Sequence, residues 1–345
     1  MKQNLMTKHA MTLAIFWGLG LLAACSSDNA KAVGPGGSTS IGGASGVGGS
    51  TSVPDTAVDG GDAAQAVGDA ATTSDAGPDG PALVNDRPYG FKVPRDYDAA
   101  KPTPLVILFH AYGATGAIQD SYFKLGDFAD TDTFLFAYPD GTLDSQQKRF
   151  WNADDACCDF YKTGIDDIAY ARAILDDVSS RYNVDPKRIF IVGHSSGGFM
   201  AHRLACELSS RVAGIVSLAG AVWNETTKCQ PSAPIAVLEV HGDADQTVLY
   251  AGGQLATTMQ PYPGARKTVA TWAQNNGCSG ALIPTGRTLD LDTTLLGAET
   301  KVEAASGCTG GAVELWTIQG GEHIPTLQTS WAETIYGFLA AHPKP

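Results

Sequence analysis

Short apolar segments alternate with helical patterns from residue 104 to the end of the chain, and this alternation restricts the fold more than any other feature. Apolar strands are expected at residues 104–109, 134–139, 188–192, 212–220, 235–242 and 312–318, and helices at residues 165–182, 265–275 and 331–341. Strands that are apolar throughout are typical of a parallel sheet covered by helices on both faces. The sequence therefore predicts an α/β fold in one domain, residues 83–345, with a mostly parallel sheet and helices on both faces.

The first 24 residues have the pattern of a secretory signal peptide. Lys2 and Lys8 give a positive start, and the apolar segment 11–24 is too short to span a bilayer as a stable helix. The segment ends in "LAAC", which resembles the bacterial lipobox and implies cleavage before Cys25 and attachment of lipid to its thiol. An ordinary signal peptide with a chance cysteine is the alternative. The chain is therefore expected to be exported and anchored in a membrane by lipid, at the cell surface or facing the periplasm.

Residues 25–82 contain no Phe, Tyr or Trp and consist largely of Gly, Ser, Thr, Ala and Asp. Such a segment cannot bury enough apolar surface to offset the entropy lost on ordering, so we predict a disordered tether between anchor and domain. The formal net charge of the chain is −13 at pH 7. Because nucleic-acid phosphates would be repelled by this charge, the composition argues against a nucleic-acid partner.

Six cysteines follow the tether: Cys157, Cys158, Cys206, Cys229, Cys278 and Cys308. In an exported protein an even number of cysteines indicates disulfides, and the spacing of these residues does not suggest a metal site. Cys278 and Cys308 are expected to pair, because both lie outside the segments that carry the motifs. The pairing of the other four cysteines stays open.

The segment "GHSSGG", which begins at Gly193, has the pattern of a nucleophile mounted on a sharp turn. The pattern Gly-x-Ser-x-Gly requires small neighbours, because its serine adopts a strained conformation between a strand and a helix. Only the frame Gly193, Ser195, Gly197 fits, and an apolar strand precedes it while a helical pattern follows. Ser195 is therefore the predicted nucleophile. The alternative is a glycine-rich turn in which Ser195 caps the helix.

A serine nucleophile needs a base and a carboxylate that orients the base. The α/β-hydrolases place these residues in the order Ser, acid, His along the chain. Exclusion of the other histidines leaves His323, in a glycine-rich segment; His194 is expected to point to the other side of the turn. The acid is sought in "HGDADQTV", where Asp245 is preferred to Asp243 because it fits the spacing from the His-Gly pair.

Negative charge develops on the carbonyl oxygen during acyl transfer, and backbone N–H groups must already point at it. One such group is expected from Ser196, which follows the nucleophile. The other is expected from Tyr112, in the turn after the first strand of the core. The ring of Tyr112 could also form a wall of the acyl pocket.

Eight segments of the chain together resemble one known family. They are "PLVILFHAYG", "AYPDGT", "FWNADDACC", "IDDIAYARAIL", "VDPKRIFIVGHSSGGFMAHRLACE", "HGDADQTVLY", "WAQNNGC" and "GGEH". In this order they are similar to the secreted polyhydroxybutyrate depolymerase and feruloyl esterase family, which implies the α/β-hydrolase fold. By position the resemblance implies Ser195 as nucleophile, Asp245 as acid and His323 as base. The family usually has glycine at Ala111, where a positive φ would be costly for alanine, and Trp-Pro-Gly where this chain has residues 324–326.

These observations predict a serine esterase that hydrolyses carboxylic esters through an acyl-enzyme. The expected substrates are polymeric or small esters: feruloyl or acetyl groups on polysaccharide, or a polyester such as polyhydroxybutyrate. No metal or organic cofactor is expected, and the domain is expected to be a monomer. The alternatives are a serine peptidase of the same fold and a non-catalytic polymer-binding lipoprotein.

Overall fold

The structure, a computed structural model, describes residues 80–345. The expected signal peptide, the lipidation site Cys25 and residues 25–79 of the expected tether lie outside the described residues. Helix α1 (Gly80–Asp86) crosses the boundary at residue 82 that the composition suggested. Between residues 80 and 345, no helix is long and apolar enough to cross a membrane.

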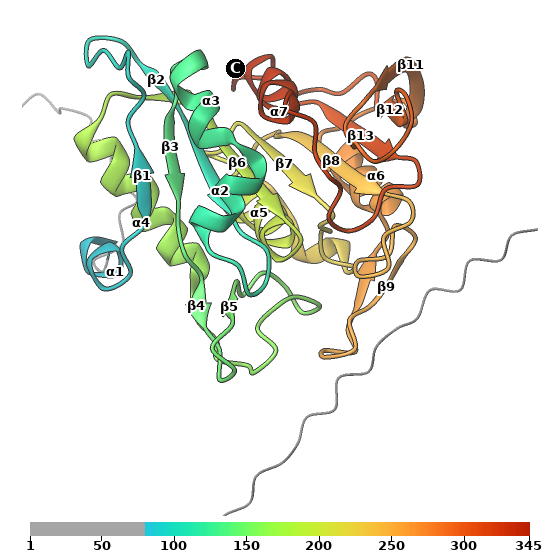
Figure 1. The fold of residues 1–345 in the computed structure, drawn as a ribbon, viewed down its shortest axis with the longest axis horizontal. Coiled ribbons are helices and arrows are strands. Elements are labelled where there is room, and N and C mark those ends of the chain that lie inside the picture. The colour runs from blue at the N-terminus through green and yellow to red at the C-terminus, as the bar shows by residue number, and fades with distance from the viewer. Residues whose placement is uncertain (1–79) are drawn as a thin grey trace, which may run out of the picture. The chain divides into compact units, whose positions relative to one another are not determined.

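The central sheet has nine strands in the order β1-β3-β2-β6-β7-β8-β13-β12-β11 (Figure 1). Their bounds are Gly90–Lys92 (β1), Thr103–Phe109 (β2), Leu135–Tyr138 (β3), Val184–His194 (β6), Gly214–Leu218 (β7), Ala236–Gly242 (β8), Ile283–Leu289 (β11), Thr300–Ala304 (β12) and Val313–Ile318 (β13). Every neighbouring pair from β3 to β13 is parallel. Strand β1 at one edge and strands β12 and β11 at the other are antiparallel. The mostly parallel sheet predicted from the sequence is confirmed.

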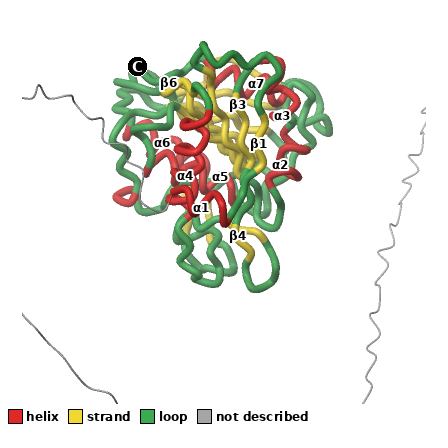
Figure 2. The backbone as a smooth tube through the Cα atoms, turned by 90° about the vertical axis from the view of Figure 1, so that its left-hand side faces the viewer, coloured by secondary structure: helices red, strands yellow, loops and turns green. Residues whose placement is uncertain are grey.

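Two layers of helices enclose the sheet, as Figure 2 shows from the side. The helices are α2 (Gly116–Phe123), α3 (Leu125–Asp132), α4 (Asp167–Arg181), α5 (Ser196–Glu207), α6 (Ala265–Asn275) and α7 (Trp331–Ala340). Alternate residues of β2 pack into different layers: Leu105 and Ile107 join the core with α4, α5 and α6, whereas Val106 and Leu108 join the core with α2, α3 and α7. A strand with both faces buried has no polar side, which explains its continuous apolar sequence.

Two short hairpins extend from the sheet: β4 (Thr142–Leu143) with β5 (Arg149–Phe150), and β9 (Gly252–Gln254) with β10 (Pro261–Pro263). A single 3₁₀ turn, η1 (Thr226–Lys228), precedes β8. Disulfides join Cys157 to Cys158, Cys206 to Cys229 and Cys278 to Cys308. The last pair is the one that the sequence favoured. Disulfides are typical of exported proteins.

Elements that the sequence pattern did not predict lie on both sides of the parallel core. Helices α2 and α3 have eight residues each, and α2 is started by Thr115, whose side chain accepts the N–H of Ile118. Strand β11 is almost wholly exposed, so it carries no apolar segment to mark it. Short or exposed elements depend on their neighbours for stability, and a hydrophobic pattern reveals them poorly.

Candidate active site

Ser195 lies on a sharp turn between β6 and α5. Its φ is 54° and its ψ is −118°, a strained backbone conformation for a residue with a side chain. The turn is possible because a Cβ on Gly193 would overlap the carbonyl of Gly197, and a Cβ on Gly197 would overlap the carbonyl of Phe109. The neighbouring Ser196 is 1% exposed, whereas Ser195 is half-buried. Of the two serines, only Ser195 therefore presents its hydroxyl at the edge of the sheet.

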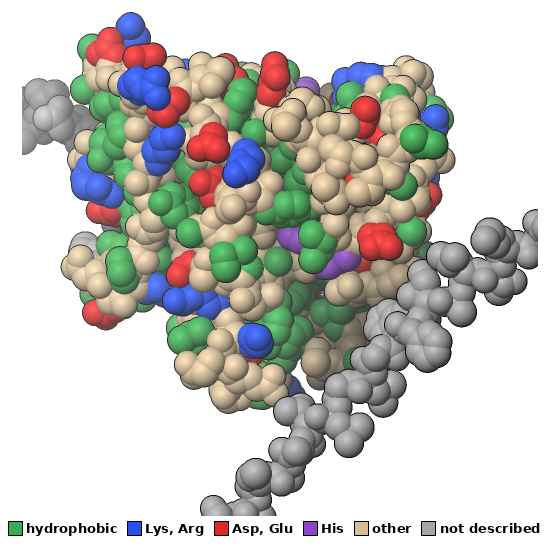
Figure 3. Space-filling view, in the orientation of Figure 1, with side chains coloured by type: hydrophobic (Ala, Val, Ile, Leu, Met, Phe, Trp, Pro, Cys, Tyr) green, Lys and Arg blue, Asp and Glu red, His purple; other side chains and the backbone are tan. Residues whose placement is uncertain are grey.

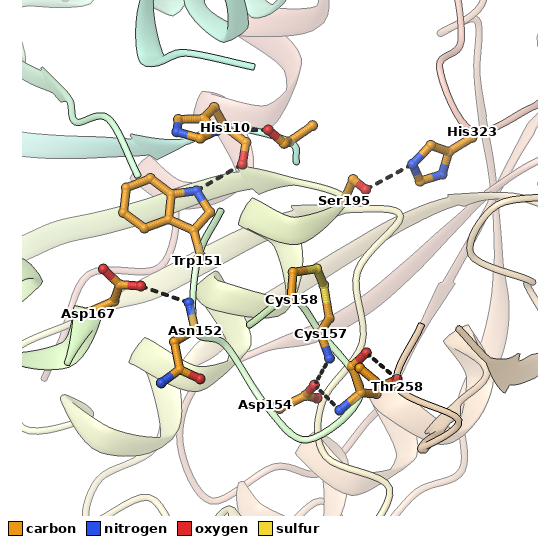
Figure 4. Close-up of a disulfide and its surroundings, with 12 residues drawn as sticks. His110, Trp151, Asn152, Asp154, Cys157, Cys158, Asp167, Ser195, Thr258 and His323 are labelled. Atoms are coloured by element: carbon orange, nitrogen blue, oxygen red, sulfur yellow. Dashed lines mark hydrogen bonds between the residues drawn. A yellow bond between two sulfur atoms is a disulfide. The ribbon is translucent and has the colours of Figure 1, made fainter. Parts of the chain in front are cut away.

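The structure brings Ser195, His323 and Asp245 together in one chain of hydrogen bonds. The Nε2 atom of His323 lies 2.9 Å from the Oγ atom of Ser195, and its Nδ1 atom lies 2.7 Å from Oδ2 of Asp245. Figure 4 marks the hydrogen bond between Ser195 and His323 with a dashed line. The three residues follow β6, β13 and β8, whose carboxyl ends meet at one edge of the sheet. Strands in a parallel sheet gather their following loops in this way.

Asp245 is fixed more firmly than Asp243, the other acid considered. Its Oδ1 atom accepts the backbone N–H groups of Thr247 and Val248 at 2.7 and 2.9 Å. Burial alone would raise the pKa of Asp245, but hydrogen bonds from His241 and His323 outweigh burial and hold the pKa well below its usual range. Asp243 accepts the N–H of Gly320 at 2.6 Å and so ties two loops together.

Two backbone N–H groups were expected from the sequence to form an oxyanion hole. Those of Tyr112 and Ser196 donate no hydrogen bond to any residue between 80 and 345. Ala111 does not have a positive φ; the positive φ in this loop belongs to Gly113, at 78°. The alanine therefore imposes no strain where the family usually has glycine, and its N–H donates to Gln119 Oε1 at 3.1 Å.

Buried side chains hold the loop that carries Tyr112. The Nε2 atom of His110 accepts the N–H of Gly141 at 2.8 Å, and the indole N–H of Trp151 donates to the His110 carbonyl at 2.9 Å. Burial lowers the pKa of His110 to about 4, so this histidine is neutral and can accept a hydrogen bond. The hydroxyl of Tyr112 donates to Asp144, which fixes the ring at the rim of the site.

Comparisons with known proteins agree with this geometry. Residues 97–262 match the phospholipase/carboxylesterase family model. Feruloyl esterase B of Piromyces equi is 30% identical over 67% of this chain, and feruloyl esterase D of Neurospora crassa is 25% identical over 70% of it. The fold resembles that of an acetyl xylan esterase from Aspergillus awamori, with a TM-score of 0.51 and 14% identity over 72% of this chain and 93% of that one.

This chain has the α/β-hydrolase fold, and its sequence is similar to feruloyl esterases. The match spans 41% of the Piromyces protein and 74% of the Neurospora protein, so the hydrolase covers less than half of the first relative.

A cleft of about 630 Å³ lies between two loops of the hydrolase. Its walls come from residues 152–164, between β5 and α4, and from residues 257–260, between β9 and β10. The face drawn in Figure 3 is hollowed between these parts of the chain, and histidine side chains (purple) lie beside the hollow. The ring of Phe160, in the cleft wall, packs 5.1 Å from the ring of Tyr112, so the cleft adjoins the loop beside Ser195.

The Cys157–Cys158 disulfide braces the cleft wall. Both cysteines are buried, and Figure 4 draws them with Ser195 and with the contacts of the loop. Asp154 accepts the N–H of Cys157 at 2.8 Å, and Thr258 donates from the opposite wall to the Ala156 carbonyl at 3.0 Å. Burial raises the pKa of Asp154 to about 7.

Sequence reasoning missed two histidines of the hydrolase that contact the three central residues. The ring of His194 was expected on the far side of the turn, but its Nε2 atom lies 3.0 Å from the His323 carbonyl and its ring packs against His323. His241, one of the histidines excluded as the base, has its Nε2 atom 3.3 Å from Oδ2 of Asp245. His194 is the last residue of β6 and His241 the last but one of β8, at the edge of the sheet where Ser195 lies. This position at the carboxyl end of a strand was the signal that could have found them.

Within residues 80–345, no group of three or more His, Cys, Asp or Glu side chains is arranged to hold a metal ion. The acids Asp166 and Asp167 begin α4: Asp166 accepts the N–H of Ala169, and the buried Asp167 pairs with Arg87 at 2.7 Å. These contacts serve the fold.

Proposed function

We propose that this hydrolase is a serine esterase in which Ser195 is the nucleophile, His323 the general base and Asp245 the orienting acid. The observation that carries the proposal is the hydrogen-bond chain from Ser195 Oγ through the His323 ring to Asp245 Oδ2, at 2.9 and 2.7 Å. A serine hydroxyl alone is a weak nucleophile, and a base within hydrogen-bond reach activates it.

The reaction begins when Ser195 Oγ attacks the ester carbonyl carbon and its proton moves to His323 Nε2. The carbonyl oxygen becomes negative, and the N–H groups of Tyr112 and Ser196 stabilise it. Collapse of this intermediate breaks the bond to the alcohol, which leaves with the proton from His323. Water then attacks the acyl-enzyme, His323 accepts its proton, and the acid leaves as Ser195 Oγ regains a proton. Asp245 stabilises the imidazolium in both steps.

The cleft beside Tyr112 supports an ester carried on a carbohydrate. Asp154, Asp155, Asp159 and Lys162 line it together with Phe160. An apolar polymer would remove these charged groups from water without giving hydrogen bonds in return, which costs free energy. Sugar hydroxyls provide such bonds, and an aromatic ring can pack on the apolar face of a sugar ring. We therefore propose feruloyl or acetyl groups on polysaccharide as the substrate class.

A polyester such as polyhydroxybutyrate is the second candidate substrate. Exposed apolar side chains stand on loops at the same edge of the sheet as Ser195: Tyr161 is 43%, Met259 63% and Ile324 64% exposed. Ile324 follows His323 directly, at the position where the chain departs from its family. Such side chains suit contact with an apolar polymer surface.

The test compares the full chain with its Ser195→Ala variant on methyl ferulate, p-nitrophenyl acetate and a polyhydroxybutyrate suspension. We expect hydrolysis of the two small esters to fall by several orders of magnitude in the variant, with unchanged folding by circular dichroism. Release of hydroxybutyrate in preference to ferulate would assign the polyester. Equal inactivity of both proteins on all three substrates would overturn the esterase and favour a polymer-binding role.

The same fold also occurs in serine peptidases, so a peptide substrate belongs in the comparison.

For location, we propose an exported protein held in a membrane by lipid on Cys25. Metabolic labelling with a fatty acid, lost in Cys25→Ser, is the expected result. Unlabelled wild-type protein in the culture medium would contradict the anchor and leave an ordinary signal peptide.

A further inference from the structure

A buried carboxylate of β8 lies behind the proposed catalytic residues and faces two histidines. Glu239 is completely buried. Its Oε2 atom lies 3.0 Å from Nε2 of His202, and its Oε1 atom lies 3.2 Å from Nδ1 of His241. An ionised carboxylate in this setting is costly unless both oxygens have charged or hydrogen-bonding partners. The protonation of the two histidines therefore decides what Glu239 does.

His202 is a neutral donor to Glu239. The indole N–H of Trp272 points at Nδ1 of His202 at 3.0 Å. An indole nitrogen only donates, so Nδ1 of His202 has to accept and carries no proton. The single ring proton is then on Nε2, directed at Glu239. This hydrogen bond favours the ionised form of the carboxyl group.

His241 has acceptors on both sides. Its Nε2 atom lies 2.8 Å from the Val248 carbonyl and 3.3 Å from Asp245 Oδ2, so Nε2 carries a proton. Its Nδ1 atom faces the Glu239 carboxylate, and a second proton there makes the ring an imidazolium. Burial alone would lower the pKa of His241, but Asp245 and Glu239 raise it to about 9. Burial alone would raise the pKa of Glu239, but the hydrogen bonds from His202 and His241 hold it below the usual value.

We propose that Glu239 keeps His241 as an imidazolium beneath Asp245, and that His241 is a positioning residue which holds Asp245 ionised and its Oδ2 atom directed at His323. The inference rests on the proposed esterase function for its kinetic consequence. The ring of Tyr250 lies 5.6 Å from the ring of His241 and perpendicular to it, and Thr317, opposite His241 on β13, is hydrogen-bonded to the Tyr250 hydroxyl.

The charge on His241 has a consequence for His323. Asp245 attracts a proton to His323, whereas the imidazolium behind Asp245 opposes it. His194, the other histidine beside His323, is neutral at working pH because burial lowers its pKa to about 4. His241 is then the positive group behind Asp245, the carboxylate that lies 2.7 Å from His323 Nδ1. Removal of this charge should let His323 take up its proton at a higher pH.

Glu239→Gln removes the negative charge that keeps His241 protonated, and it does so without removing a hydrogen bond. The amide oxygen of the introduced glutamine can accept from His202, and its N–H can donate to Nδ1 of a neutral His241. We expect the acid limb of the kcat/KM profile on methyl ferulate to move up by about half a pH unit or more. We expect kcat to fall about tenfold while KM changes less than about twofold, because Glu239 does not touch the substrate. His241→Gln should shift the limb in the same direction.

Glu299→Gln is the matched control, because Glu299 is also a buried carboxylate. It accepts the N–H groups of Leu291 and Asp292 at 2.9 and 3.2 Å and has no contact with Glu239 or His241. The acid limb of the kcat/KM profile of Glu299→Gln should match that of the wild-type chain. Acid limbs in Glu239→Gln and His241→Gln that coincide with the wild-type limb would overturn the proposal.

A second measurement does not depend on activity, and its first part needs only the wild-type chain. In the wild-type chain with ¹⁵N-labelled histidine, one ring should keep both nitrogens protonated at about pH 8, above the ordinary histidine range. Glu239→Gln should lose this signal. A wild-type spectrum with only neutral rings at that pH would overturn the charged His241. Failure of the wild-type chain to hydrolyse any ester would instead overturn the proposed function, and the spectrum would still decide the charge.

Discussion

His194 and His241 are both buried beside the same three residues, yet their environments drive them to opposite charge states. His194 contacts a backbone carbonyl and aromatic rings, and burial lowers its pKa to about 4. His241 lies between two carboxylates, and these raise its pKa to about 9 in spite of burial. Burial alone favours the neutral ring, and nearby carboxylates can reverse that preference. One histidine thus supports the base through a hydrogen bond, and the other supports the acid through its charge.

The largest effect should come from Asp245→Asn, which removes the carboxylate that contacts both His241 and His323. An amide cannot hold the required tautomer of His323, so we expect kcat to fall on the order of 10,000-fold. The variant should also lose the imidazolium signal of His241 at lower pH than the wild type does. Asp243→Asn is the control and should lose less than about tenfold, since Asp243 only ties two loops. Comparable losses in both variants would contradict the assignment of Asp245.

His194→Phe should have a smaller effect and a different signature. The phenyl ring can pack on Tyr122, Phe123 and His323 as the imidazole does. Its loss of the N–H donor leaves the His323 carbonyl without this partner. We expect kcat to fall about tenfold with the acid limb of the pH profile in place, because no charge has been removed. A shifted limb would show that His194 is charged and would break the comparison.

The two histidines should also stabilise the domain in opposite pH ranges. The folded-state pKa of His194 lies below the unfolded value of about 6.5, so the unfolded chain gains a proton first as the pH falls. This difference in pKa should lower the free energy of unfolding by about 2 kcal/mol between pH 7.5 and 4.5. The free energy of unfolding of His194→Phe should fall less over that range. His241 has a raised pKa, so its contribution is complete below about pH 6.5 and is lost as the pH rises toward 9. The measurement is the free energy of unfolding in urea, followed across this pH range for His194→Phe, His241→Gln and the wild-type chain. Curves of free energy against pH that run parallel in all three would contradict the opposite charge states of the two histidines.

The parallel core and its serine turn could be predicted from the sequence because both depend on local patterns. The buried parts of strands β2, β6 and β8 are mostly apolar, and the glycines around Ser195 mark the turn. Strand β11 was missed because its residues are exposed and carry no periodic apolar signal. The position of Ala111 is a third case: the sequence suggested a strained backbone, whereas the loop places the positive φ two residues later, at Gly113.

The contacts behind the site were beyond sequence reasoning because they join residues far apart in the chain. Glu239, His202 and Trp272 belong to β8, α5 and α6, and no spacing along the chain links their side chains. The prediction that the His194 ring points to the other side of the turn was wrong for the same reason. Alternation along β6 predicts the face of the sheet to which the His194 side chain points. It does not predict the loop that packs on that face, because this loop, which carries His323, follows a different strand, β13.

The sequence by itself determined the fold class, the strained serine, the order of the three central residues and the Cys278–Cys308 pair. Local steric demands and hydrophobic periodicity are written in neighbouring residues, which explains this success. Only the tertiary structure decided which groups surround Asp245 and His323, how the Cys157–Cys158 loop and residues 257–260 form a cleft, and which buried histidine sits between carboxylates. These depend on which atoms meet when strands and loops come together, and the charge of a buried group follows from those partners.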